Sequence, residues 1–370
     1  MRIALVGGGT GGHFYPLIAV VEAIKKEDPN VDFYYIGPNA YRKDILDEYN
    51  INFVKCPAGK LRLYSSIQNT LDLFRVIGGV LVAWYKLYIL MPDVIFSKGG
   101  YTSVPVLMMA RFYRIPVVIH ESDSVPGRAN KMAKKFAKYI AISYKESLDY
   151  FPKEKTALTG IPIREDLINP SAEDPFTTLG IPNDMPLIYI TGGSSGAERI
   201  NDVVLQTLPD LLSNYRVFHQ TGVDNEESVR VAVKTLIQDD TMLDRYYIKG
   251  ELDVNTVSAI LRAASLVISR AGSTTLHEIS IHGKPSIIIP IPESISRDQR
   301  TNAYAYTKTG AGLILEESNL TRNLLVEQIN TIMTNADKYK TMSQIALQFA
   351  HKDAAQKLTQ ILLKTGRDHG

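Results

Sequence analysis

Short runs of apolar and β-branched residues alternate along the chain with longer segments of helical periodicity. The first run, Arg2–Val6, ends in glycines, and apolar positions then recur at helical spacing over Pro16–Lys26. This alternation predicts βαβ units, in which helices cover both faces of a parallel sheet. The other strands expected in the first half are Phe33–Ile36, Val94–Ser97, Pro116–His120 and Tyr139–Ser143.

The pattern restarts in the second half, after a stretch rich in Pro, Asp and Gly at Asn169–Pro186. Leu187–Thr191 is a second strand that leads into a glycine loop, and Arg216–Gln220, Leu266–Ser269 and Ser286–Pro290 are expected to follow it as strands. The 370 residues exceed the roughly 250–300 at which single cores stop growing. We therefore predict an α/β protein of two Rossmann-like domains.

The domain boundary is expected near a hinge at Ile161–Asp166, because the first half ends in Gly160-Ile161-Pro162. This places residues 1–163 in an N-terminal domain and 164–339 in a C-terminal domain. The segment Asp337–Thr365 is amphipathic and helical in pattern. A C-terminal helix within residues 340–370 is therefore available to pack back on the first domain.

Composition narrows the classes of function. Hydrophobic residues make up 45% and charged residues 22%, and 41 basic against 39 acidic residues give no support for nucleic-acid binding. The lone Cys56 excludes an intramolecular disulfide and a Cys-rich metal site. We recognise no signal peptide and no run of about 20 apolar residues that would span a membrane. The expected location is the cytoplasm, and these features do not decide whether the protein binds a membrane surface.

Two glycine loops follow strands, one in each half. Gly7–His13 and Thr191–Ala197 both connect a strand to a helix, where glycines let a ligand approach the backbone and the helix N-terminus favours phosphate. The first loop lacks the dinucleotide pattern and the Walker Gly-Lys-Ser/Thr ending, which disfavours NAD and a P-loop nucleotide site. If the domains form a cleft, the two loops face each other and suit substrates that each carry a diphosphate.

A third segment, Ser269–Glu278, combines small polar residues with a glutamate inside the predicted helix. The small residues suit a helix N-terminus that donates backbone N–H groups, and Glu278 is placed to accept hydrogen bonds from the two hydroxyls of a ribose. The segment Asp298–Ala303 lies one strand later and suits sugar hydroxyls.

Six motifs in one order identify a family resemblance over essentially the full chain. The motifs are GGTGGH at Gly8–His13, HESDSVPGRAN at His120–Asn130, GIPIR at Gly160–Arg164, GGSSGAERIN at Gly192–Asn201, SRAGSTTLHE at Ser269–Glu278 and QRTNA at Gln299–Ala303. With these motifs, the chain resembles the MurG family of GT-B glycosyltransferases, in which two Rossmann-like domains face each other across a cleft.

The resemblance implies transfer of N-acetylglucosamine from UDP-N-acetylglucosamine to undecaprenyl-diphosphate-linked N-acetylmuramoyl-pentapeptide, a step of peptidoglycan synthesis. It implies that the N-terminal domain takes the acceptor and the C-terminal domain the UDP-sugar. The residues implied in donor binding are Thr10, Gly11, Gly12, Arg164, Ser194, Ser273, Thr274, Thr275, Leu276, Glu278 and Gln299. Those implied near the acceptor diphosphate are Gly9, Gly11, Gly12, His120, Asn130 and Gly193.

Two positions depart from the family pattern. The family usually has asparagine where this chain has Asp123, and histidine or glutamine where this chain has Asp298. An anionic Asp123 that faces phosphates requires a nearby cation, for which Lys131 and Arg128 are the candidates in the sequence. The substrate contacts at these positions are therefore expected to differ from the family pattern.

The expected reaction inverts the anomeric carbon, with the C4 hydroxyl of the muramoyl sugar as nucleophile. An imidazole with an ordinary pKa near 6.5 suits a general base at neutral pH, so His13 is the first choice, with Glu121 and Asp123 as rivals. The loop dipoles and Arg164 would stabilise the leaving diphosphate. Because the chain has no Asp-x-Asp pair, we expect no obligate metal or cofactor.

One stretch is expected at an anionic membrane surface, because a helical stripe of apolar residues is flanked by Arg75 and Lys86. The apolar members are Leu71, Phe74, Ile77, Leu81 and Trp84. The competing interpretation is a helix packed into the core. The enzyme is then expected as a peripheral protein at the cytoplasmic face of the bacterial membrane.

Three alternative functions stay open at this point. A GT-B enzyme with another lipid or polysaccharide acceptor has the same architecture. A UDP-N-acetylglucosamine 2-epimerase uses a similar cleft without transfer, and the GGTGGH and HES segments disfavour it. A non-catalytic nucleotide-sugar-binding partner is disfavoured because this chain keeps both glycine loops.

Overall fold

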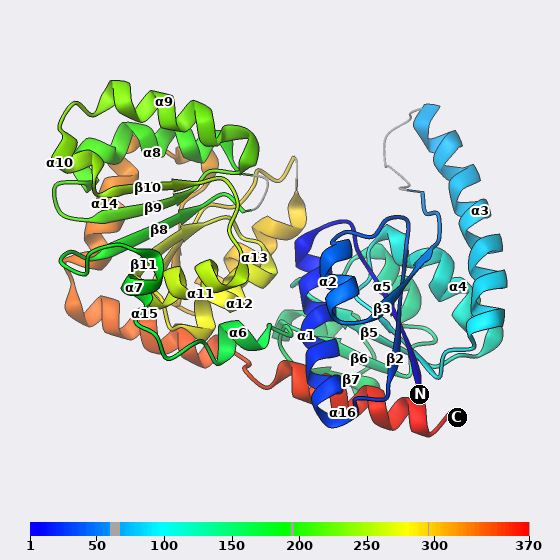
Figure 1. Ribbon diagram of the computed structural model, residues 1–370. Coiled ribbons are helices and arrows are strands. Elements are labelled where there is room, and N and C mark those ends of the chain that lie inside the picture. The colour runs from blue at the N-terminus through cyan, green and yellow to red at the C-terminus, as the bar shows by residue number, and fades with distance from the viewer. Residues whose placement is uncertain (60–66, 194–195, 295, 370) are drawn as a thin grey trace. The chain divides into compact units, whose positions relative to one another are not determined.

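The computed structural model describes residues 1–59, 67–193, 196–294 and 296–369, without the side chains of residues 67–71, 73 and 297. The chain divides into two compact units (Figure 1). Unit 1 contains Met1–Arg164 and Lys352–Gly370, and unit 2 contains Glu165–His351. The chain therefore passes between the units twice.

Unit 1 is built on a seven-stranded parallel sheet in the order β3-β2-β1-β4-β5-β6-β7. Its central strands are buried on both faces and read as unbroken apolar runs, as in parallel sheets covered by helices. The strands are β1 (Arg2–Val6), β2 (Asp32–Gly37), β3 (Ile51–Lys55), β4 (Val94–Ser97), β5 (Val117–Glu121), β6 (Tyr139–Ile142) and β7 (Thr156–Leu158).

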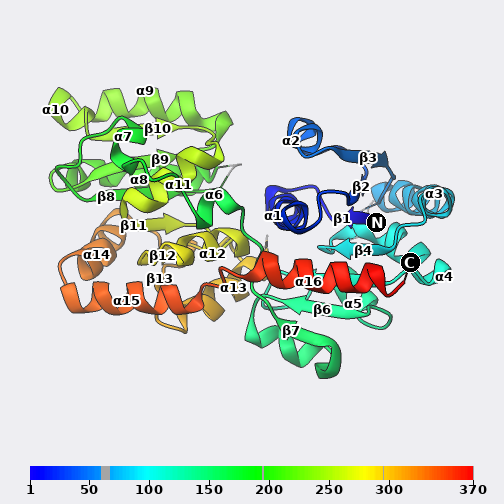
Figure 2. The same cartoon turned by 60° about the horizontal axis from the view of Figure 1, so that its bottom comes forward.

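Two apolar clusters form the core of unit 1, and each joins the strands to a different set of helices. One joins them to α1 (Gly11–Glu27) and α16 (Ala354–Arg367), which contact each other and cross (Figure 2). The other joins them to α3 (Ile67–Leu90), α4 (Val104–Tyr113) and α5 (Arg128–Ala133). The short α2 (Lys43–Glu48) precedes β3.

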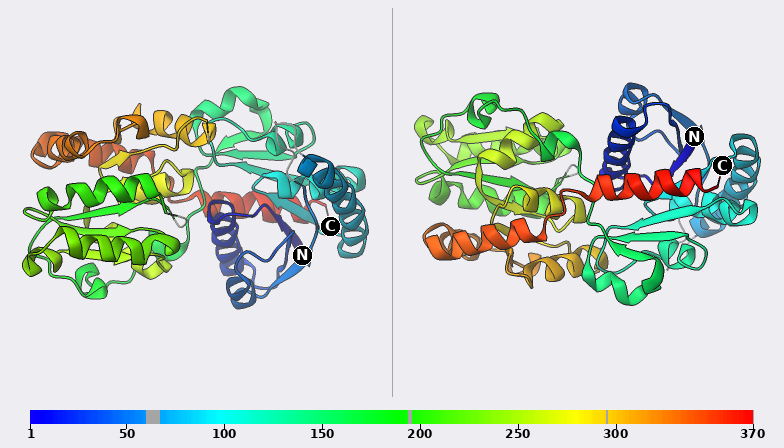
Figure 3. Two further views of the ribbon diagram at one scale, coloured as in Figure 1. Left: turned by 90° about the horizontal axis from the view of Figure 1, so that it is seen from above. Right: turned by 90° about the horizontal axis from the view of Figure 1, so that it is seen from below.

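Unit 2 contains a six-stranded parallel sheet in the order β10-β9-β8-β11-β12-β13. Figure 3 shows helices on both sides of this sheet. Its strands are β8 (Leu187–Thr191), β9 (Arg216–Gln220), β10 (Tyr246–Lys249), β11 (Ala264–Ser269), β12 (Ser286–Ile288) and β13 (Gly312–Ile314). Its longer helices are α8 (Glu198–Leu211), α9 (Glu226–Leu236), α11 (Val254–Ala263), α12 (Ser273–Ile281), α13 (Arg297–Thr307), α14 (Arg322–Met333) and α15 (Ala336–Phe349). Three one-turn helices complete it: α6 (Glu165–Ile168), α7 (Pro175–Leu179) and α10 (Asp240–Leu243).

The amphipathic C-terminal segment is two helices, where the sequence pattern indicated one. Its first part, α15, packs on α12 in unit 2, and its second part, α16, packs on α1 and β4 in unit 1. Residues 350–353 separate them, with Ala350 in an extended conformation. The break occurs because the two apolar faces are buried in different units.

Candidate active site

The first glycine loop lies at the point of the unit 1 sheet where the strand order reverses. From β1 the chain builds outward to β2 and β3, and then returns to β4 on the other side of β1. In open parallel sheets, ligands bind outside the carboxyl ends of the strands at such a point. Gly7–Thr10 follows β1, and Lys98-Gly99-Gly100 follows β4. The geometry therefore places these two loops beside each other.

The loops approach too closely for side chains. A Cβ at Gly8 would overlap the Tyr35 hydroxyl, and one at Gly99, which has φ +78°, would lie 2.9 Å from Asn130 Nδ2. A Cβ at Gly100 would make only an ordinary contact with His13 Nε2, at 3.7 Å, so it is the φ of +77° that favours glycine there. The glycines thus allow the ends of β1 and β4 and the helix α5 to converge on one small region.

His13 lies in the first turn of α1 and is half-buried. Its Nδ1 is 3.0 Å from the hydroxyl of Thr10, the residue that precedes the helix. Burial, and next the positive charge of Lys98, lower the pKa of His13 to about 4. The imidazole is therefore neutral at neutral pH, which is the form that accepts a proton.

Lys98 is a buried residue of this region that the motif analysis did not single out. Its side chain is 2% exposed, its Nζ lies 2.7 Å from His120 Nδ1, and it donates a hydrogen bond to Ser122 Oγ. The signal in the sequence is a lysine placed directly between an apolar strand and a glycine pair. A lysine there is rarely buried without partners.

The segment after β5 is fixed by its own hydrogen bonds. The Glu121 carboxylate accepts from the backbone N–H groups of Asp123 and Gly127, both at 3.0 Å, and from Asn130 Nδ2 at 2.9 Å. Burial, and next the charge of Asp123, raise the pKa of Glu121. His120 is fully buried, whereas Asp123 is half-buried. Glu121 thus shapes the loop that presents Asp123.

Arg164, the last residue of unit 1, stacks on an aromatic ring of α1. Its guanidinium carbon lies 4.3 Å from the centre of the Tyr15 ring. Tyr15 in turn accepts a hydrogen bond of 3.3 Å from Arg42. Cation–π stacking restricts the Arg164 side chain and leaves the edge of its guanidinium for hydrogen bonds. Arg164 therefore lies against α1, on a tyrosine two residues after His13.

Unit 2 repeats the arrangement at the reversal between β8 and β11. Gly193, with φ +86°, donates its N–H to Thr191 Oγ1 at 2.9 Å, and Thr191 donates to Gln220. A Cβ at Gly192 would lie 2.5 Å from the backbone nitrogen of Ala197, so this tight turn requires glycine. Ser194, expected in donor binding, lies outside the described residues.

The loop after β11 leads into α12, which begins at Ser273 after Gly272. Ser273 and Leu276 are buried, and Thr274, Thr275 and Glu278 are half-buried. The first turn carries no acidic residue, which leaves the positive end of the helix dipole available to an anion. Gln299, in the first turn of α13, is half-buried, and its Oε1 has no hydrogen-bond partner among the described residues.

The apolar stripe of α3 is exposed. Phe74 is 67% exposed and Leu81 62%, and Ile77 and Trp84 are each about half exposed. The opposite face, with Ala83 and Leu87, packs into the core. The Leu71 side chain lies outside the described part, Arg75 pairs with Asp72 at 3.0 Å, and Lys86 lies 5.9 Å from the Tyr85 ring centre. In the described residues, no helix is long and apolar enough to cross a membrane.

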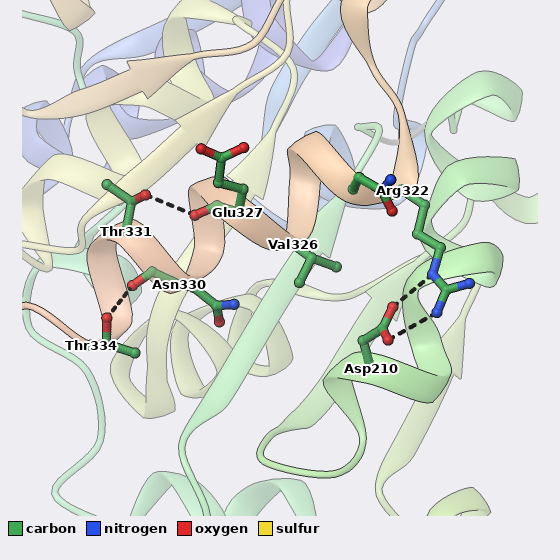
Figure 4. Close-up of a pocket in the computed structure, with 8 residues that line it drawn as sticks. Asp210, Arg322, Val326, Glu327, Asn330, Thr331 and Thr334 are labelled. Carbon is green, nitrogen blue, oxygen red and sulfur yellow. Dashed lines mark hydrogen bonds and ion pairs between the residues drawn. The ribbon is translucent and has the colours of Figure 1, made fainter.

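A separate pocket of about 530 Å³ lies between α8 and α14 of unit 2 (Figure 4). Arg322 closes one side of it through a bidentate pair with Asp210, at 2.8 and 2.9 Å. Its lining includes none of the residues that the motifs indicated. Among the described residues, no group of three or more His, Cys, Asp or Glu side chains is placed to hold a metal.

Comparison with known proteins matches both units to one class of enzyme. Residues 3–142 match the glycosyltransferase family 28 N-terminal domain, and residues 187–358 match the glycosyltransferase family 28 C-terminal domain. Two parallel α/β units with glycine loops at the carboxyl ends of their strands agree with this match. The fold and site thus define a family 28 glycosyltransferase of GT-B fold.

Individual relatives identify the family within this class of enzymes. A Bacillus thuringiensis protein named UDP-N-acetylglucosamine–N-acetylmuramyl-(pentapeptide) pyrophosphoryl-undecaprenol N-acetylglucosamine transferase 2 is 37% identical, over 92% of this chain and 94% of its own. The crystal structure of Acinetobacter baumannii MurG superposes with a TM-score of 0.75 at 24% identity, covering 98% and 99% of the two chains. The chain belongs to the MurG family.

A similar fold occurs in an enzyme of another activity. The UDP-GlcNAc 2-epimerase of Neisseria meningitidis, whose structure is bound to UDP-GlcNAc, superposes with a TM-score of 0.70 over 98% of this chain and 100% of its own. The identity is 13%, so the likeness concerns the fold alone. The fold alone therefore does not distinguish transfer from epimerisation.

Proposed function

We propose that this protein transfers N-acetylglucosamine from UDP-N-acetylglucosamine to the C4 hydroxyl of undecaprenyl-diphosphate-N-acetylmuramoyl-pentapeptide. The observation that carries the proposal is the 37% identity over nearly the full chain to a relative named for this transfer. Both units also present a glycine loop and a helix N-terminus at a reversal of strand order, as two diphosphate substrates require.

The donor is assigned mainly to unit 2. The N-terminus of α12 supplies backbone N–H groups from Ser273, Thr274, Thr275 and Leu276 for the diphosphate of UDP. Glu278, on the same helix, accepts hydrogen bonds from the ribose hydroxyls, and Gln299 contacts the N-acetylglucosamine. Arg164 and Ser194 also contact the donor, as do Thr10, Gly11 and Gly12 of unit 1.

The acceptor diphosphate is assigned to the first glycine loop and the segment after β5. Gly9, Gly11 and Gly12 allow the phosphates to approach the backbone at the start of α1, with Gly193 as a contact from unit 2. His120 and Asn130 support this site from the interior, because both are buried and hydrogen-bonded to neighbouring backbone.

His13 is assigned as the general base. If Nδ1–H donates to Thr10 Oγ1, the lone pair is on Nε2, which then accepts the proton of the C4 hydroxyl. The hydroxyl oxygen attacks the anomeric carbon as the bond to UDP breaks, so an α-linked donor gives a β product. Of the rival bases, Glu121 is already engaged by three N–H donors, and Asp123 stays the alternative.

The leaving UDP takes the electron pair of the broken bond. The helix N-termini and Arg164 stabilise the negative charge that develops on its diphosphate. We expect this stabilisation to need no obligate metal or cofactor.

We further propose that α3 binds an anionic membrane at its cytoplasmic face, which makes the enzyme a peripheral membrane protein. Phe74, Ile77, Leu81 and Trp84 form an exposed apolar stripe, and Arg75 and Lys86 lie on the same helix. Apolar side chains insert at the headgroup boundary while basic groups attract anionic lipid. This arrangement gives access to an acceptor that remains in the bilayer.

A single assay tests the reaction against its alternatives. UDP-N-acetylglucosamine labelled in the sugar is incubated with the purified protein and the lipid-linked acceptor in detergent micelles. Label in the organic-extractable product is the expected result. Release of UDP-N-acetylmannosamine would indicate the epimerase instead, and UDP binding without turnover would indicate a non-catalytic partner.

A further inference from the structure

Lys98 is the buried cation at the reversal point of the unit 1 sheet. It follows β4 directly, and its backbone N–H donates to Val6 at the end of β1 at 2.8 Å. A Cβ at Gly7 would lie 2.8 Å from the Lys98 Cβ, so the lysine backbone and stem lie against the first glycine loop. The ammonium extends to the other side, toward the segment after β5.

The hydrogen bonds of His120 define which of its ring nitrogens carries the proton. His120 Nε2 lies 2.8 Å from the carbonyl oxygen of Gly160, which only accepts, so Nε2 carries the proton. His120 Nδ1 is then the acceptor for Lys98 Nζ at 2.7 Å. Lys98 thereby connects the end of β4, the segment after β5 and the strand end that leads to Arg164.

Nearby carboxylates influence the protonation of Lys98. The charged and titratable groups that act on or contact Lys98 are His13, His120, Glu121 and Asp123. Burial lowers the pKa of Lys98 to about 7, while Glu121 and next Asp123 oppose that shift. The carboxylates thus favour the ammonium form.

The two cations that the sequence suggested for Asp123 are both exposed. Lys131 is exposed, with its Nζ 5.3 Å from the centre of the Tyr150 ring, and Arg128 is exposed. Neither is buried with the segment as Lys98 is.

We propose that Lys98 is the positioning residue of the acceptor site, where it holds His120 and Ser122 and offsets the charge of Asp123 so that the loop accepts a diphosphate. The inference rests on the proposed function and concerns residues that lie together in unit 1. Without Lys98, Asp123 would repel the anionic acceptor. Without both charges, the repulsion would disappear and only the contacts to His120 and Ser122 would be lost.

A double-mutant cycle tests this coupling. Wild type, Lys98→Met, Asp123→Asn and the double variant are compared for kcat and for the KM of each substrate. We expect Lys98→Met to raise the acceptor KM at least tenfold and to change the UDP-N-acetylglucosamine KM less than twofold. The double variant should have an acceptor KM at least fivefold lower than that of Lys98→Met. Lys131→Met is the matched control, with kinetics expected to equal those of the wild type.

Each contrary outcome has a distinct meaning. If the double variant is no better than Lys98→Met, Lys98 does not offset Asp123, and its role is limited to its contacts with His120 and Ser122. If Lys131→Met raises the acceptor KM and Lys98→Met does not, Lys131 is the cation. If the wild type does not turn over the acceptor at all, the proposed function itself fails, independently of the cycle.

A second measurement does not require a Lys98 variant to fold. In protein labelled with ¹³C at the lysine side chains, the resonance that titrates near pH 7 is followed in wild type and Asp123→Asn. Removal of the carboxylate should lower that pKa, because Asp123 favours the ammonium. An unchanged titration would overturn the proposed charge pairing.

Discussion

At the scale of single residues, burial acts in opposite directions on neighbouring groups of unit 1. It lowers the pKa of His13 to about 4 and that of Lys98 to about 7, and it raises the pKa of Glu121. In each case the neutral form is favoured. Lys98 and Glu121 nevertheless have hydrogen-bond partners for their charged forms. His13 is neutral at neutral pH and can accept a proton, and its pKa of about 4 makes it a weaker base than an ordinary imidazole.

Replacement of His13 by alanine should therefore reduce turnover more than binding. We expect kcat to fall by about 10²–10⁴, the usual contribution of a general base, with UDP affinity within twofold of wild type. Steady-state kinetics and calorimetry measure the two quantities. His369→Ala, at an exposed position of the same unit, is the control. A kcat within threefold of wild type would transfer the base role to Asp123.

Replacement of Glu278 by alanine should weaken UDP binding. Hydrogen bonds to a charged acceptor contribute about 1.5–3 kcal/mol each, so loss of the ribose contact should cost at least tenfold in affinity. Titration calorimetry with UDP measures the effect. Glu227→Ala, which removes an exposed carboxylate from α9, should bind UDP as the wild type does. Equal affinities of the two variants would remove Glu278 from the donor site.

The sequence could indicate the glycine loops but not Lys98 as part of the site. Glycines after an apolar strand mark a backbone conformation, and this signal is local in the chain. The interaction of Lys98 with His120 joins residues 22 positions apart on neighbouring strands. Only the register of β4 and β5 brings them together. A polar residue directly after a central strand was the available clue.

At the scale of elements, the central strands were predictable, and the edge strands were not. β1, β4, β8 and β9 have the bounds that their apolar runs predict. The four strands that the pattern missed, β3, β7, β10 and β13, are the outer strands of the two sheets. An outer strand has one neighbour and is exposed in part, so its residues are mixed, as in β3. Its position depends on pairing rather than on composition.

The interior of unit 2 depends on a neutral histidine that links three elements. Asn201 of α8 donates from Nδ2 to the Thr221 carbonyl at 3.1 Å, so its Oδ1 accepts from His219 Nε2 of β9 at 3.0 Å. His219 Nδ1 accepts from the Tyr246 hydroxyl of β10 at 2.6 Å. Burial lowers the pKa of His219 to about 3. Both ring nitrogens therefore have a suitable hydrogen-bond partner only when the imidazole is neutral.

This histidine should make unit 2 less stable in mild acid. Below an unfolded pKa of about 6.5, the unfolded chain binds a proton that the folded unit does not, so the unfolding free energy falls as pH falls toward 3. Hydrogen exchange of the slowest amides of unit 2, at pH 7 and at about pH 5, measures the slope. His219→Gln should flatten it, and His369→Gln should not. Equal slopes in all three proteins would assign the effect to other groups.

At the scale of the whole molecule, each unit has its own parallel sheet and its own core. The last two helices belong to different units: α15 packs in unit 2, and α16 packs on α1 and β4 in unit 1. The amphipathic pattern of the segment predicts helix but does not identify the partner of each apolar face. The same ambiguity applies to α3, because an apolar stripe is consistent with core packing and with membrane contact. The exposure of Phe74 and Leu81 favours membrane contact.

Membrane binding by α3 can be separated from catalysis with a matched pair of variants. Leu81→Glu places a charge in the exposed stripe, and Leu236→Glu makes the same change on α9 of unit 2, where the leucine is 52% exposed. Burial of a leucine side chain contributes about 1.5–3 kcal/mol, so Leu81→Glu should lower binding to phosphatidylglycerol vesicles at least tenfold in a flotation assay. Leu236→Glu should bind the vesicles as the wild type does. Because neither leucine is among the residues assigned to substrate binding or proton transfer, turnover of the acceptor in detergent micelles should be equal in the two variants. If Leu81→Glu bound vesicles as well as Leu236→Glu, the exposed stripe of α3 would have to serve another partner.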